Sequence, residues 1–218
     1  MGTPSHAAGI LRSDGWRQCR RAQLEISCIM VTDENAPLPL DSPRWSELAH
    51  VYGSAVDMPV AIRRLERLDH IEAHCDGPLV EITSAIYHQG DPDTGSYATV
   101  PHLVRIAESR PPGERLPLLS LCGWIEQYRT SRRPRIPEDL EPAYRDALAR
   151  ALTMTIELLA VPRSSWGPFG DPYDLHHIFM SIAALSGERK LAFLIDHIDD
   201  LEFYLKQENP EDWPPWPE

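Results

Sequence analysis

The chain has 218 residues, of which 42% are apolar and 25% charged. These values are typical of a folded globular protein and exclude a chain that is disordered throughout. Its formal net charge of −12 disfavours nucleic acids and anionic membranes as partners, because cationic surfaces bind both, and it favours a basic protein as the partner. Acidity that serves only to keep the protein soluble is the alternative.

The N-terminal stretch differs in charge from the rest of the chain. Residues 1–29 are basic, whereas the sequence after Met30 is acidic and begins with a Pro-rich lead-in. We therefore predict a disordered basic arm and lead-in over residues 1–41. Our hypothesis is that translation starts at Met30, and a translated arm is the alternative.

The first two helices are predicted from cap and stop signals. Ser42 is a suitable N-cap and Gly53 a suitable stop, and the segment between them has an apolar stripe. That stripe consists of Trp45, Leu48, Ala49 and Tyr52. Asp57 is the expected cap of the second helix, with Pro59 in its first turn. Its inward residues are expected to be Ala61, Leu65 and Leu68.

A helical hairpin is predicted over residues 79–109. Leu79, Ile82 and Ile86 share one helical face, and residues 88–92 (HQGDP) then break the helix with Gly and Pro. Thr99 offers an N-cap oxygen for the second helix, and Pro101 would then fall in its first turn. The inward face of this second helix is expected to consist of Val100, Leu103, Val104 and Ala107.

An internal repeat covers both hairpins. Residues 58–66 align with 100–108, and residues 78–82 align with 117–121. Ser84 then meets Gly123 as a small residue suited to close helix approach. The period of roughly 40 residues is that of HEAT and armadillo helix pairs, although two copies can also align by coincidence.

Three further helices are predicted after a Pro-broken linker at residues 132–137. The first covers residues 142–160, the second ends at Gly187, and the last runs to Ile198. Their expected core residues are Leu148, Ala151, Leu152, Thr155, Leu159, Leu175, Ile178, Phe179, Ile182, Leu191, Leu194, Ile195 and Ile198. The predicted fold is all-α with about seven to eight helices in a domain over residues 42–206. An acidic Trp/Pro tail follows at 207–218, and its Trp213 and Trp216 are expected to dock on the last helices.

The sequence contains no motif that indicates catalysis, a cofactor or a metal. His70 and His74 are four residues apart, with Cys75 adjacent, but no pattern supplies the further ligands that zinc needs. There is no GxSxG elbow, Gly-rich phosphate loop or His-Asp dipeptide. The four cysteines are scattered singly, no apolar run approaches the length that spans a bilayer, and the first residues lack the apolar region of a signal peptide. We expect a cytoplasmic protein with no cofactor that is not an enzyme.

Two aromatic and acidic clusters are candidate contacts for a partner. One lies at one end of the central hairpin and consists of Tyr87, His88, Gln89, Asp91, Asp93 and Tyr97. The other lies in the Gly- and Pro-rich stretch before the penultimate helix and includes Trp166, Asp171 and Tyr173. Aromatic anchors flanked by acids suit binding of a basic partner. The alternative is that Tyr87 and Tyr97 only pack and cap the hairpin.

Several segments together resemble a group of bacterial HEAT-repeat-like proteins. The opening WSEL, YGSA and DMP segments (residues 45–48, 52–55 and 57–59) precede IYHQG (86–90) and YATVPHL (97–103). The resemblance covers about residues 43–205, and the His-Gln-Gly segment is its most specific part. Residues 91–96 lengthen the usual gap before Tyr97. The resemblance implies a short right-handed α-solenoid whose exposed face binds another macromolecule, in proteins that look like immunity or adaptor partners.

The leading hypothesis is a non-catalytic binding module that sequesters a basic partner such as a toxin domain. An enzyme or small-ligand-binding protein is the alternative, with His88 or His176 in a helical concavity. A structural homodimer is the third.

Overall fold

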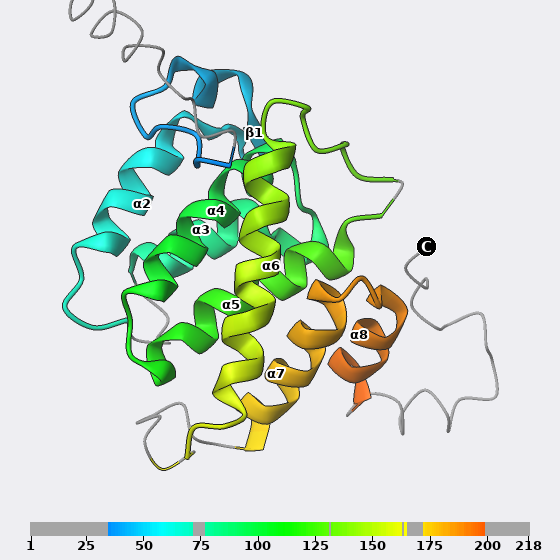
Figure 1. Ribbon diagram of the computed structural model, residues 1–218. Helices are drawn as coiled ribbons and strands as arrows, with labels where there is room; N and C mark the ends of the chain where they lie inside the picture. Colours follow the sequence, from blue (N-terminus) through cyan, green and yellow to red (C-terminus); the bar gives the residue numbers. More distant parts are fainter. Residues whose placement is uncertain (1–34, 72–76, 131, 163, 165–171, 199–218) are drawn as a thin grey trace, which may run out of the picture. The chain divides into compact units, whose positions relative to one another are not determined.

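A computed structural model describes residues 35–71, 77–130, 132–162, 164 and 172–198. The all-α prediction is confirmed for this part of the chain, which contains seven α-helices and a single two-stranded ladder (Figure 1). The helices are α2 (Met58–Glu66), α3 (Pro78–Ile86), α4 (Thr94–Glu108), α5 (Pro112–Tyr128), α6 (Glu141–Leu158), α7 (Pro172–Leu185) and α8 (Arg189–Asp196). Among these helices, none combines the length and the apolar character that crossing a bilayer requires. The basic arm, the Met30 start, His74, Cys75 and the tail with its two tryptophans lie outside the described residues.

The prediction of a single helix between Ser42 and Gly53 is wrong. Ser42 does cap a short 3-10 helix, Pro43–Glu47, but the chain is then extended and forms the hairpin strands β1 (Ala49–His50) and β2 (Gly53–Ser54). The backbone N–H of Ala49 donates to Thr94 Oγ1 at 2.9 Å, a bond to a distant residue that replaces a helical one. Trp45 and Leu48 are buried as predicted, whereas Tyr52 is exposed.

The last residues of the lead-in belong to the folded domain. Leu38 and Leu40 pack against the core, and His102 Nε2 donates to the carbonyl of Leu38 at 2.9 Å. The indole N–H of buried Trp45 donates to the Pro39 carbonyl at 3.0 Å. The folded domain therefore begins before Ser42, because two buried ring N–H groups take their acceptors from this segment.

Helix α4 begins six residues earlier than predicted. Its N-cap is Asp93, whose carboxylate accepts from Thr94 N at 2.6 Å while Ser96 Oγ accepts from Asp93 N at 2.9 Å. This capping box satisfies two N–H groups at once, so it defines the helix start in preference to Thr99. The Thr99 hydroxyl instead donates to Gly95 O at 2.8 Å within the helix, and Pro101 lies in the helix interior.

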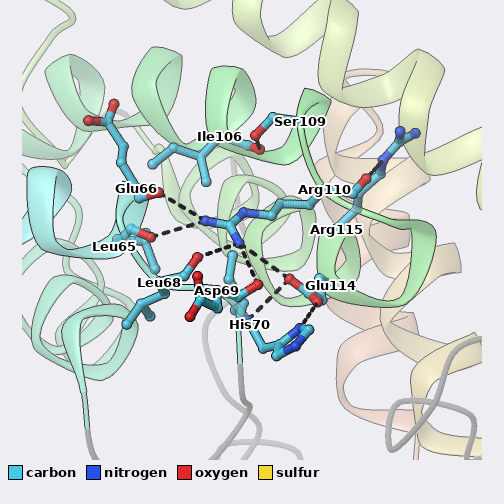
Figure 2. A network of polar contacts seen from close by, with 11 residues as sticks. Leu65, Glu66, Leu68, Asp69, His70, Ile106, Ser109, Arg110, Glu114 and Arg115 are labelled. Atoms are coloured by element: carbon cyan, nitrogen blue, oxygen red, sulfur yellow. Dashed lines mark hydrogen bonds and ion pairs between the residues drawn. The ribbon is translucent and has the colours of Figure 1, made fainter.

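An arginine joins the end of α2 to the connection between α4 and α5. The guanidinium of Arg110 donates to the carbonyls of Leu68 at 2.7 Å and Glu66 at 3.1 Å, among others (Figure 2). These are carbonyls at the C-terminal end of α2 that lack helical partners. Glu114 adds a second link by accepting from Ile71 N at 3.1 Å.

The helices pack as successive pairs with one additional helix. Helix α2 packs on α3, α4 on α5, and α6 on α7, while α4 also contacts α6 and α5 contacts α7. Helix α8 lies against α7 and α5. Helices α5 and α7 approach closely at Gly123, where an added Cβ would lie 2.9 Å from Ser181 Cα. A small residue at this position was predicted from the repeat.

Part of the predicted core of the C-terminal helices is exposed. Ala151, Thr155 and Ile178 are buried as predicted. Helix α6 also buries Ala143, Tyr144, Ala147, Met154 and Leu158. Leu159, which follows the helix, is exposed, so its predicted core position is wrong. The predictions for Phe179, Leu191 and Ile198 are also wrong, because each is about half exposed.

Candidate functional site

The turn after α3 has an unusual backbone conformation. His88, Gln89 and Gly90 form one turn of 3-10 helix, and Gln89 has a φ of 52° and a ψ of 35°. Gln89 is the one non-glycine residue in the described ranges with a positive φ. Such a conformation costs on the order of 1 kcal/mol or more and persists only where the surroundings hold it.

Contacts from two other segments hold this turn. Arg133, in the linker before α6, donates from Nη2 to the Gly90 carbonyl at 3.0 Å and forms an ion pair with Asp91. On the other side Gly90 lies against the ring of Tyr128, where an added Cβ would be 2.7 Å from Cδ1. The turn is therefore fixed by the end of α5 and by the linker before α6.

An aromatic stack lies next to the turn. Tyr87 lies parallel to Trp124 of α5, with ring centroids 5.6 Å apart and ring planes 7° apart, and packs edge-on against Tyr128. Trp124 Nε1 donates to Asp196 Oδ1 at 3.1 Å, which connects the stack to α8. Burial raises the pKa of both tyrosines, so the two phenols stay neutral at any physiological pH.

Four residues next to one another carry the exposed polar groups around the turn. The phenol of Tyr52, 65% exposed, lies 3.0 Å from Ser84 Oγ and 3.4 Å from His88 Nδ1. Gln89 follows His88 and is exposed. We call Tyr52, Ser84, His88, Gln89 and the neighbouring Asp91 the turn surface. It brings together residues of the β-hairpin, of α3 and of the turn itself.

The structure separates the predicted binding residues into two kinds. His88, Gln89 and Asp91 belong to the turn surface, whereas Asp93 caps α4 and Tyr87 is part of the aromatic stack. Trp166 and Asp171 lie outside the described residues, as does the side chain of Tyr173.

Tyr97 is not available as a surface contact. It is fully buried, its hydroxyl donates to the carbonyl of Pro134 at 2.9 Å, and its ring packs edge-on against Tyr144. Burial raises the pKa of Tyr97 to about 12. Placing Tyr97 in the site was therefore wrong, because the earlier start of α4 turns this side chain into the core.

Tyr52 and Ser84 were not predicted as site residues. Tyr52 was assigned to a core stripe that required a helix through residue 52, and the β-hairpin removes that requirement. Ser84 was noted only as a small residue for helix packing. The four-residue spacing of Ser84 and His88 was a weak signal, because α3 ends at Ile86 and the two residues do not share a helical face.

The histidine beside this surface has a structural role. His50 is buried, its Nε2 lies 2.9 Å from Asp57 Oδ1, and its Nδ1 accepts from the backbone N–H of Tyr52 at 3.1 Å. Because both ring nitrogens have partners, His50 has no free nitrogen to act on a substrate. Within the described ranges, no group of three or more His, Cys, Asp or Glu side chains is placed to hold a metal ion.

The buried carboxylate of Glu126 holds the C-terminal end of α5, which contacts the turn. The carboxylate of Glu126 accepts from Arg129 Nε at 2.8 Å, from Arg129 Nη2 at 2.5 Å, and from the Tyr144 hydroxyl at 3.0 Å. The hydrogen bonds to Glu126 raise the pKa of Arg129, and burial raises that of Tyr144. The cluster ties the last turn of α5 to α6 with charge-assisted hydrogen bonds.

An apolar groove lies elsewhere on the molecule, between α7 and α8. It has a volume of about 570 Å³, and His176 is among its lining residues, but no residue of the turn surface is. The two histidines proposed for the enzymatic alternative, His88 and His176, therefore belong to separate features.

No protein-family model, curated protein or solved structure matches this chain. The resemblance to HEAT-repeat-like proteins therefore stays a prediction.

Proposed function

We propose that this chain is a non-catalytic protein-binding module whose turn surface contacts the partner. The observation that carries the proposal is the left-handed backbone of exposed Gln89, held by Arg133 and by the contact of Gly90 with Tyr128. Strained backbone is concentrated at functional sites, and a surface fixed before binding loses little entropy when a partner docks.

Charge supports a basic partner for this surface. Asp91 within this surface and Asp57 beside it keep side chains that are 48% and 64% exposed although they contact Arg133 and His50, and the chain carries a formal net charge of −12. Rim carboxylates of this kind increase the rate of encounter with a cationic surface. We propose that the partner is a basic protein. More specifically, we propose that this chain is an immunity-type protein that sequesters a toxin domain.

The order of helix contacts supports a HEAT-like stack. The pairs α2–α3, α4–α5 and α6–α7 would be three successive hairpins, with α4 on α6 and α5 on α7 as contacts between neighbouring hairpins. The prolines that align in the repeat differ in their helix positions. Pro59 lies in the first turn of α2, whereas Pro101 lies in the interior of α4, because α4 begins farther ahead of its proline. A right-handed α-solenoid is the architecture that we propose from this order.

Affinity capture with the full chain tests the proposed function. A tagged wild-type protein, expressed in its source organism, should retain one basic protein in a stoichiometric complex. A variant with Tyr52→Ala, His88→Ala and Gln89→Ala should lose most of it, because the turn surface is removed while the core is unchanged. Recovery of the bait alone from the wild type, or equal recovery with the triple variant, would refute the proposal.

The matched control is Ile156→Ala. Ile156 is exposed on α6, near Glu157, which pairs with Arg115 in the first turns of α5. Because Gly90 contacts Tyr128 at the other end of α5, the control lies on the order of 20 Å from the turn surface at 1.5 Å of helix rise per residue. This variant should retain the partner as the wild type does.

A further inference from the structure

The groove between α7 and α8 is built from residues whose pattern predicted a core. Phe179, Leu191 and Ile198 are 46%, 50% and 53% exposed. Together with Leu175, Ile182 and Ile195 they line a volume of about 570 Å³. Exposed apolar side chains gathered in one groove are typical of a contact with another segment or molecule.

Each of the two helices has a second apolar face in addition to the one that it buries. Helix α7 buries Ile178 and Ala184, and α8 buries Ala192 and Phe193. Leu191 and Ile195 of α8 and Ile198, two residues past its end, follow at spacings of four and three and line the same groove. Two parallel stripes with a groove between them form a receptor for an amphipathic segment.

We propose that residues 199–218 of the same chain cover this groove. They begin directly after Ile198, which lines the groove, and they include Leu201, Tyr204 and Leu205 at the spacing of one helical face. Helix α8 and the residues next to its two ends line the groove from Glu188 to Ile198, a span on the order of 15 Å at 1.5 Å per residue. A chain of 20 residues reaches several times farther, so this segment can return along the whole of α8.

Tethering and charge favour this occupant over a separate molecule. A segment joined to the groove by one or two residues has an effective concentration on the order of millimolar. A return along α8 brings the acids Glu208, Glu211 and Asp212 toward Arg189 and exposed Lys190 at the start of that helix. Opposite charges and the helix N-terminus then favour the antiparallel direction.

A double-mutant cycle in the full-length chain tests the contact. Leu205→Ser and Leu191→Ser should each lower the midpoint of urea unfolding, and the double variant should lower it by little more than the larger single change. Residues in contact give such a coupling, whereas distant residues give additive effects. In the matched control, Leu205→Ser should combine additively with Ile156→Ser, because Ile156 is exposed on α6. Additive effects of Leu205→Ser with Leu191→Ser would overturn the proposal.

Two further measurements keep the test independent of stability changes. Leu205→Ser should raise the fluorescence of bound ANS roughly two- to threefold, because it uncovers the groove, with an unchanged helical circular dichroism signal. Light scattering should give the mass of one chain at every concentration. A dimer that dissociates in Leu191→Ser but not in Leu205→Ser would assign the groove to a second copy and would also overturn the proposal.

Discussion

Gly90 and the ring of Tyr128 touch so closely that a Cβ on residue 90 would lie 2.7 Å from Cδ1 of the ring. This contact joins the turn after α3 to the last turn of α5. Gly90 also has a φ of 77°, a conformation that L-residues with side chains rarely adopt. The turn that presents His88 and Gln89 is therefore tied to one aromatic ring.

Gly90→Ala is expected to destabilise the fold more than a comparable glycine substitution. The matched control is Gly187→Ala, because Gly187 has a φ of 87° and no atom within 4 Å of an added Cβ. Both variants pay a backbone strain of about 1 kcal/mol, and Gly90→Ala adds about 1–3 kcal/mol of overpacking against Tyr128. Urea unfolding measures the difference. Equal losses in the two variants would show that the ring does not hold the turn.

Loss of the buried carboxylate beneath the turn should be costly. Glu126→Gln leaves Arg129 without its anionic partner, and the side chains of this pair are only 5% and 27% exposed. We expect a loss of about 3 kcal/mol in the free energy of unfolding. Glu141→Gln breaks the exposed pair with Arg145 and should change it by less than about 0.5 kcal/mol. Similar losses in both variants would contradict a buried role for Glu126.

His102 should make the domain less stable below neutral pH. Burial lowers the pKa of His102 to about 4 from its usual 6.5, so between these values the unfolded chain binds more protons than the folded one. Stability therefore falls as the pH decreases from about 6.5 towards 4, by up to roughly 3 kcal/mol.

The variant His102→Gln isolates this effect. The amide can still donate to the Leu38 carbonyl but does not titrate. The difference in unfolding free energy between wild type and variant should therefore shrink as the pH is lowered from 7 to 5. A difference that is constant over this range would exclude His102 as the titrating group.

The approach of α5 to α7 depends on the absence of a side chain at residue 123. Gly123→Ala would place a Cβ 2.7 Å from Oγ of Ser181 and 2.9 Å from both its Cα and its Cβ, and should cost about 1–3 kcal/mol. Adding Ser181→Gly removes two of the three colliding atoms, Oγ and Cβ, and should recover part of that loss in thermal unfolding. A double variant that is no more stable than Gly123→Ala would place the strain elsewhere.

The apolar periodicity predicted most helices and many core residues correctly, and the errors have physical causes. Leu79, Ile82 and Ile86 are buried as predicted, because a three- and four-residue spacing fixes one helical face. The start of α4 was missed because Asp93 and Ser96 form a reciprocal cap that the apolar pattern does not register. The hairpin at residues 49–54 was missed because its bonds, such as that from Ala49 to Thr94, join distant parts of the chain.

The candidate site was predicted in part for the same reason. His88, Gln89 and Asp91 follow one another in a turn, so their neighbourhood is local and the Gly and Pro signals reveal it. Tyr52 joins them only through tertiary folding. Arg133 is likewise distant in sequence, and its contact with the Gly90 carbonyl has no local signal.

Site-specific photo-crosslinking in the source organism tests the turn surface most directly. A photoreactive phenylalanine analogue replaces Gln89, which is exposed in the turn, or Ile156, which is exposed on α6. Our account predicts a covalent adduct with one basic protein from position 89 and none from position 156. An adduct from position 156 alone, or none from position 89 while the captured complex stays intact, would contradict it.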